Sequence, residues 1–102
     1  MSIKYDSISP SQIRKQKHYL QNAIFQMIPY REEKYAYLDA RFSSLLQELN
    51  GLNYLCGGQT VILTIMSLLE FARHENDFTQ YRKAILDATA MVDCIKEGDG
   101  IV

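Results

Sequence analysis

Large apolar residues recur along two segments of the chain at alternating spacings of three and four positions. The first set is Tyr35, Leu38, Phe42, Leu45, Leu49 and Leu52. The second set is Phe78, Tyr81, Ile85, Ala88, Val92 and Ile95. This spacing gathers each set in one stripe along a helix, a pattern typical of helices that bury one face against other helices. The two stripes therefore predict an all-α protein held together by side-chain packing.

Start and stop signals divide the chain into four predicted helices, over about 10–28, 30–50, 59–75 and 77–97. Pro10 follows Ser9, and this order is typical of a helix start, because serine caps the helix and proline suits its first position. Gly51 is the natural left-handed residue after the second helix, with a further half turn over Leu52, Tyr54 and Leu55 as the alternative. Asp77 is a good cap for the fourth helix. Pro29 predicts a tight turn before the second helix, with a continuous kinked helix from 10 to 50 as the alternative.

Short connections between consecutive helices favour antiparallel neighbours, so the fold prediction is a four-helix antiparallel bundle. The segment 59–75 is apolar on nearly every side, which predicts the central helix. A pair of helical hairpins that completes its core only as a dimer is the runner-up. We expect residues 1–102 to form one domain, with 1–8 and 98–102 as loosely ordered tails. The topology also places Cys56 and Cys94 at one end of the bundle, as reduced thiols.

Composition narrows the class of protein. The chain has 102 residues, of which 47% are apolar and 23% charged, and its formal net charge is −1. These fractions are ordinary for a globular domain. A net charge this small gives no overall electrostatic attraction to nucleic acid or to an anionic membrane. Low net charge with high apolar content favours self-association. The start, MSIKYDSISPSQ, lacks a secretory pattern, and two cysteines do not make a disulfide framework. The uncharged stretch 50–69 is interrupted by polar residues and glycine. We therefore predict a cytoplasmic protein with no membrane span.

No motif in the sequence carries catalytic chemistry. Glu70, His74 and Glu75 resemble metal ligands on one helix, but bundles that bind two metals need matching ligands on other helices. His18 and Cys56 lack the surroundings of a catalytic nucleophile, and no glycine loop matches a phosphate cradle. We therefore predict no enzymatic activity, no catalytic residue, no cofactor and no metal.

One candidate interaction surface is the basic cluster Arg14, Lys15, Lys17 and His18. It lies near the start of the first predicted helix, where the helix dipole disfavours cations. A cluster kept at this small cost in stability indicates a role in binding. The cluster could contact nucleic-acid phosphate, an acidic protein or lipid headgroups. Alternatively, its cations pair with Asp6 or Glu97 at the same end of the bundle.

A second candidate surface is the group Tyr30, Tyr35 and Tyr37. The three residues crowd one predicted helix start, and one helix face cannot hold them all, so at least one should be exposed. Exposed tyrosine is a common anchor in protein interfaces. The plainer alternative is that the three rings close the end of the bundle with their hydroxyls in water.

These observations favour a non-enzymatic helical protein that acts by protein–protein interaction, as an adaptor, inhibitor or regulator, with homodimer formation as one variant. The first alternative is association with nucleic acid through Arg14, Lys15 and Lys17. The second is a bundle of the bacteriocin-immunity type, an idea that rests on chain length and helical content alone.

Overall fold

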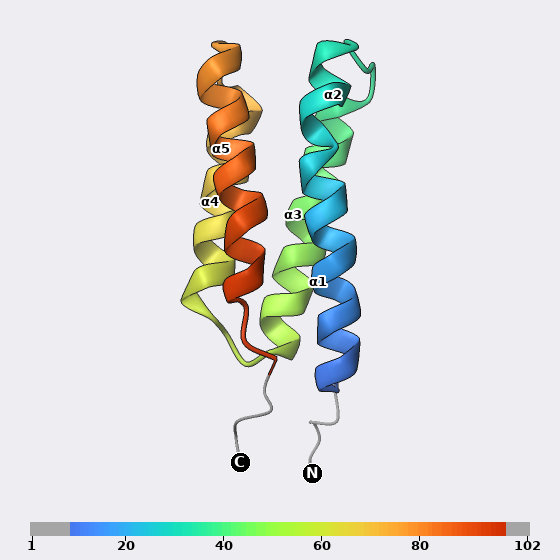
Figure 1. Ribbon diagram of the computed structural model, residues 1–102, viewed down its shortest axis with the longest axis vertical. Coiled ribbons are helices and arrows are strands. Elements are labelled where there is room, and N and C mark those ends of the chain that lie inside the picture. Colours follow the sequence, from blue (N-terminus) through green and yellow to red (C-terminus); the bar gives the residue numbers. More distant parts are fainter. Residues whose placement is uncertain (1–8, 98–102) are drawn as a thin grey trace.

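The structure, a computed structural model, describes residues 9–97, and this part of the chain is helical without strands. Its elements are α1 (Pro10–Phe25), α2 (Met27–Glu32), α3 (Leu38–Leu55), α4 (Thr60–His74), α5 (Phe78–Met91) and the 3-10 turn η1 (Val92–Cys94). The rod made by α1 and α2 packs antiparallel to α3, and α4 packs antiparallel to α5 (Figure 1). The predicted all-α four-helix bundle is confirmed. The predicted loose tails, 1–8 and 98–102, lie outside the described residues.

Both apolar stripes face a shared interior. The first stripe contributes Phe42, Leu45, Leu49 and Leu52 from α3. The second contributes Tyr81, Ile85, Ala88, Val92 and Ile95. Leu38 and Phe78 are partly buried against this core, and Tyr35, which precedes α3, stays exposed. No polar or charged residue is buried within residues 9–97, so burial of apolar surface is the main stabilising term.

The predicted turn at Pro29 is wrong, because the first helix continues through it to Glu32. Helical hydrogen bonds run from Gln26 N to Asn22 O and from Tyr30 N to Gln26 O, each at 3.0 Å. Pro29 has no N–H to donate, and this loss interrupts the helix only at Gln26, between α1 and α2. Burial of Ile28 favours continuation, since a turn there would expose it. The alternative prediction, a continuous kinked helix from 10 to 50, is closer to the structure, but the helix ends at Glu32 and not at residue 50.

The turn between α2 and α3 has the geometry of a Schellman motif. Tyr35 N donates to Tyr30 O at 2.9 Å, and Lys34 N donates to Arg31 O at 3.0 Å. Lys34 adopts the left-handed conformation, with φ of 56°. The rings of Tyr30 and Tyr35 stack with their centroids 4.8 Å apart, which supplies the side-chain contact that accompanies this motif. This turn occupies the predicted start of the second helix, which therefore begins at Leu38 and not at residue 30.

Because a left-handed residue with a Cβ atom is strained, we expect Lys34→Gly to raise the free energy of unfolding by about 1 kcal/mol. Urea denaturation measures the change. Lys34→Ala is the matched control, since alanine removes the long side chain but keeps the Cβ atom. An equal gain in both variants would contradict backbone strain as the cause.

The connection between α3 and α4 repeats the motif, with glycine in the strained position. Gly58 N donates to Asn53 O at 2.8 Å, and Gly57 has φ of 81°. Gly51 does not end the helix. α3 continues to Leu55, as the alternative of a further half turn predicted, because Leu52 extends the buried stripe.

The two ends of the bundle are closed by polar contacts. At one end the Asp77 side chain accepts a hydrogen bond from Gln80 N at 3.2 Å, which confirms the predicted cap of α5. At the other end Gln59 exchanges two hydrogen bonds with the backbone of Lys96, at 3.0 and 2.9 Å. The fourth helix tightens into η1 at Val92, so it ends before the predicted residue 97.

Cys56 and Cys94 belong to this second end, in the α3–α4 connection and η1, and both thiols are free. Burial raises the pKa of the Cys56 thiol. Within residues 9–97, no helix combines the length and the apolar character that crossing a bilayer requires.

The prediction that 59–75 forms a central helix is wrong. Only one side of α4 is buried, through Ile62, Ile65, Leu69 and Ala72. Four helices arranged around one core have no central member, so each keeps an outer side. On α4 that side includes Leu63 and Phe71, which are 52% and 50% exposed.

Candidate functional site

The four residues of the predicted basic cluster do not act together. Two of them contact residues 95–97, and the other two are exposed. Arg14 Nη2 lies 3.1 Å and Lys17 Nζ 3.2 Å from the carboxylate of Glu97, and Lys17 Nζ also donates to Ile95 O at 2.8 Å. The hydrogen bond from Lys17, helped by Arg14, holds the pKa of Glu97 below its usual range. The predicted pairing with Glu97 is therefore present, and Asp6, the other predicted partner, lies outside the described residues. Arg14 and Lys17 fasten the chain after η1 to α1, while Lys15 and His18 remain exposed.

The candidate metal ligands do not converge. His74 Nε2 lies 3.6 Å from Glu70 Oε1, but Glu75 accepts a hydrogen bond from Asp77 N at 3.0 Å instead of joining them. No group of three or more histidine, cysteine or acidic residues suited to a metal occurs in the described part of the chain.

The three predicted tyrosines form one ordered array, which we call the tyrosine turn (residues 30–37). Tyr35 stacks on Tyr30, and the Tyr35 and Tyr37 rings meet edge to face with their centroids 5.8 Å apart. Tyr35 is 40% exposed and Tyr37 is 67% exposed. The guanidinium carbon of Arg41 lies 6.0 Å from the Tyr30 ring centroid, on the α3 side of the array. The turn therefore presents aromatic surface whose rings are already positioned before any partner binds.

A second surface is the outer face of α4, which we define as Thr60, Leu63, Thr64, Ser67, Phe71 and His74. All six are exposed, and they lie on the side opposite the buried residues. A hollow of about 530 Å³ lies along its α3 side, lined by Leu46, Leu63, Met66, Ser67 and Glu70.

An ion pair stands beyond the hollow, towards the carboxyl end of α4. Arg73 donates to Asp39 Oδ1 at 2.7 Å and to the Ser43 hydroxyl at 2.7 Å. This hydrogen bonding holds the pKa of Asp39 below its usual range. Because α3 supplies Asp39 and Ser43, the guanidinium of Arg73 is directed to α3 and not to the outer face of α4.

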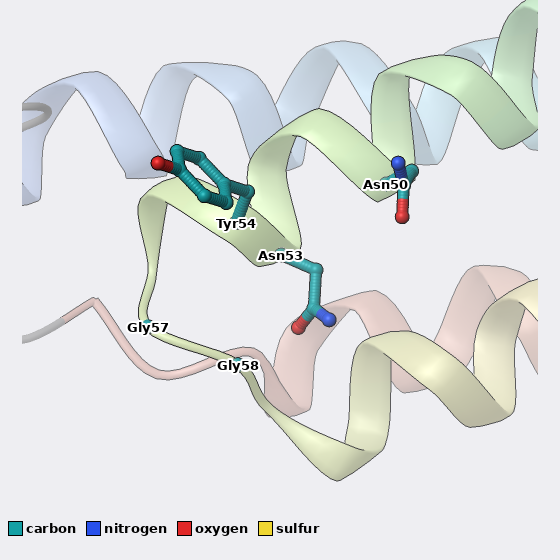
Figure 2. A pocket seen from close by; sticks show the side chains of 5 residues that line it. All are labelled: Asn50, Asn53, Tyr54, Gly57 and Gly58. Carbon is teal, nitrogen blue, oxygen red and sulfur yellow. The ribbon is translucent and has the colours of Figure 1, made fainter.

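A further hollow lies at the α3–α4 connection, and it does not gather a set of functional groups. Figure 2 shows its lining residues, Asn50, Asn53, Tyr54, Gly57 and Gly58. The Asn53 and Tyr54 side chains point in different directions. Asn53 Oδ1 accepts a hydrogen bond from Gln59 N at 2.6 Å, so its role is to shape the loop. Tyr54 is 84% exposed and stands alone, and it serves below as a control residue.

Sequence reasoning found the tyrosine turn but missed the outer face of α4. The missed signal was the spacing of Thr60, Thr64, Ser67 and Phe71, which places small polar residues and one large ring opposite the buried stripe. Comparisons with protein-family models, curated proteins and solved structures found no match. Function must therefore be inferred from the two surfaces themselves.

Proposed function

We propose that this chain is a non-enzymatic protein that binds another protein through the tyrosine turn, as an adaptor, inhibitor or regulator does. The observation that supports the proposal most is the ordered stack of Tyr30, Tyr35 and Tyr37, in which two of the rings are exposed. Tyrosine is enriched at binding hot spots, because a positioned ring contributes a large contact area and loses little conformational entropy on binding.

Backbone strain and charge in the turn also favour protein binding. Lys34 keeps a left-handed conformation that glycine would adopt at lower cost, and strained residues of this kind cluster at functional sites. Glu32 and Glu33 are exposed beside Lys34, so the turn carries charges of both signs. Mixed charge suits the polar rim of a protein interface and disfavours a continuous phosphate backbone.

The two alternatives have less support. Association with nucleic acid would need Arg14 and Lys17, whose side chains are engaged with residues 95–97. A role of the bacteriocin-immunity type stays a prediction from chain length and helical content. The proposal includes a cytoplasmic location, since the free thiols of Cys56 and Cys94 suit a reducing compartment.

Affinity capture from an extract of the native host tests the proposal. We expect the wild-type chain to recover one stoichiometric protein partner, and Tyr35→Ala/Tyr37→Ala to bind it at least tenfold more weakly, since loss of a hot-spot side chain costs about 2 kcal/mol. Tyr54→Ala is the matched control, because it removes an even more exposed tyrosine at the other end of the bundle and should keep full binding. A partner bound equally by every variant, or no partner at several salt concentrations, would refute the proposal.

A further inference from the structure

The outer face of α4 has more apolar surface than the bundle covers. Its sequence is apolar on nearly every side, as in helices that other helices surround, yet α3 and α5 cover only one side. Single exposed apolar residues are ordinary on protein surfaces. Here, however, two large side chains, Leu63 and Phe71, are each about half exposed on one helix, and a hollow borders the first of them. This combination is typical of an interface.

We propose that a second copy of this chain covers the face, in a two-fold symmetric pair of antiparallel α4 helices centred on Ser67. The spacing supports this arrangement: Leu63 lies four residues before Ser67, and Phe71 lies four residues after it. A two-fold axis at Ser67 therefore places Leu63 of each copy opposite Phe71 of the other. Such an interface uses the same patch on both copies, as closed two-fold dimers require.

The hollow between α3 and α4 borders the proposed contact on its Leu63 side. Leu63 lines that hollow together with Leu46 and Met66, so Phe71 of the second copy arrives at its level along the helix. At the centre of the contact stands Ser67, flanked by Thr64, and small side chains let two helix axes approach to about 8–10 Å. A large ring packed across the interface against an apolar side chain is typical of a binding hot spot.

The distribution of charge points to a copy of the same chain as the occupant. From residue 49 to residue 69 the sequence has no charged residue, so charge beside the face is confined to its carboxyl end, where Glu70 and His74 lie 3.6 Å apart. Glu70 borders the face and His74 belongs to it, and the symmetry sets this charged end opposite the uncharged Thr64 and Thr60 of the second copy. Like charges therefore do not meet, and a net charge of −1 adds little repulsion between copies.

The pairing leaves the tyrosine turns open. The carboxyl end of α4 and the tyrosine turn lie at the same end of the bundle (Figure 1). Because the two α4 helices are antiparallel, the two tyrosine turns point to opposite ends of the dimer, where each can bind separately. The dimer uses a face distinct from the tyrosine turn, so it holds or fails independently of the proposed function.

Light scattering of the full chain at roughly 5–300 µM tests the pairing, a range suited to the micromolar affinity of a small interface. We expect the measured mass to rise towards twice the 11.8 kDa of one chain. Leu63→Ala and Phe71→Ala should each weaken association at least tenfold, with unchanged helical circular dichroism. Phe25→Ala is the matched control, because Phe25 is 46% exposed but lies on α1, and it should not change the association. A monomer throughout, or a dimer insensitive to both α4 changes, would overturn the proposal.

A cysteine at the proposed axis tests the centre of the pair. Ser67→Cys, made in a Cys56→Ser/Cys94→Ser background, should form a covalent dimer under mild oxidation, since the axis brings the two Cα atoms within the roughly 7 Å that a disulfide needs. Ala90→Cys, at an exposed position on α5, reports random collisions. Cross-linking of Ser67→Cys no faster than that of Ala90→Cys would place the axis elsewhere and overturn the arrangement.

Discussion

Replacing Leu69 by alanine is expected to lower the free energy of unfolding by about 3 kcal/mol, whereas replacing Leu63 should lower it by less than about 1 kcal/mol. Both leucines lie on α4, six residues apart. Leu69 is fully buried in the core, so its truncation removes apolar burial and leaves a cavity. Leu63 is half exposed in one chain. Urea denaturation at a protein concentration at which light scattering gives the mass of a monomer measures both changes.

Repeating the Leu63 measurement at higher protein concentration connects this comparison to the proposed dimer. Association stabilises the folded state by mass action, so the wild-type chain should gain stability with concentration. The stability of Leu63→Ala should rise little with protein concentration. The stability of Leu69→Ala should rise with concentration as much as that of the wild-type chain does. Equal losses for both leucines at low concentration would show that the single chain already covers Leu63, which contradicts the outward orientation of this side of α4.

The helices were predictable where burial and periodicity agree. Phe42, Leu45 and Leu49 repeat at helical spacing and all reach the core, because the same spacing that defines a stripe also turns it towards one side. The errors occur where a single helix-breaking residue was given more weight than burial. Pro29 lies between buried Ile28 and half-buried Tyr30, and its missing hydrogen bond costs less than exposing that turn of the helix would.

The candidate site was predictable only as far as neighbours in sequence define it. Tyr30, Tyr35 and Tyr37 had to lie close together, but their stacking depends on the left-handed backbone of Lys34, for which lysine gives no sequence signal. The outer face of α4 was missed for a different reason. Composition shows that a helix is apolar on several sides, but the neighbouring helices decide which sides they cover.

Contacts between residues far apart in sequence were beyond prediction, and one of them should dominate the stability of the end that carries the tyrosine turn. Arg31 donates from Nη1 to Glu75 O and from Nη2 to Asn76 O, each at 2.6 Å. Its guanidinium carbon lies 4.4 Å from the Tyr81 ring centroid. The Tyr81 hydroxyl in turn donates to Met27 O at 2.6 Å, and burial raises the pKa of Tyr81 to about 12. α2 is thus tied both to α5 and to the α4–α5 connection.

We therefore expect Arg31→Ala to lower the free energy of unfolding by about 2–3 kcal/mol, because it removes two charge-assisted hydrogen bonds and a cation–π contact. Arg31→Lys should recover less than half of the loss, since an ammonium group cannot reproduce the planar fork that reaches two carbonyl oxygens. Arg82→Ala, at an exposed position on α5, is the control and should change stability by less than about 0.5 kcal/mol. Urea denaturation measures all three variants.

The same change should loosen the tyrosine turn. Alanine keeps the backbone carbonyl of residue 31, which accepts the hydrogen bond from Lys34 N in the Schellman motif, but it removes the side chain that holds this residue against the α4–α5 connection. In Arg31→Ala the amides of Lys34 and Tyr35 should exchange hydrogen faster than in the wild-type chain. The most protected core amides of α5 report the loss of global stability, and the increase in the turn should exceed the increase there. Faster exchange restricted to the α4–α5 connection would show that Arg31 secures only that connection. Faster exchange in the turn as well would mean that one arginine positions the aromatic array proposed to bind the partner.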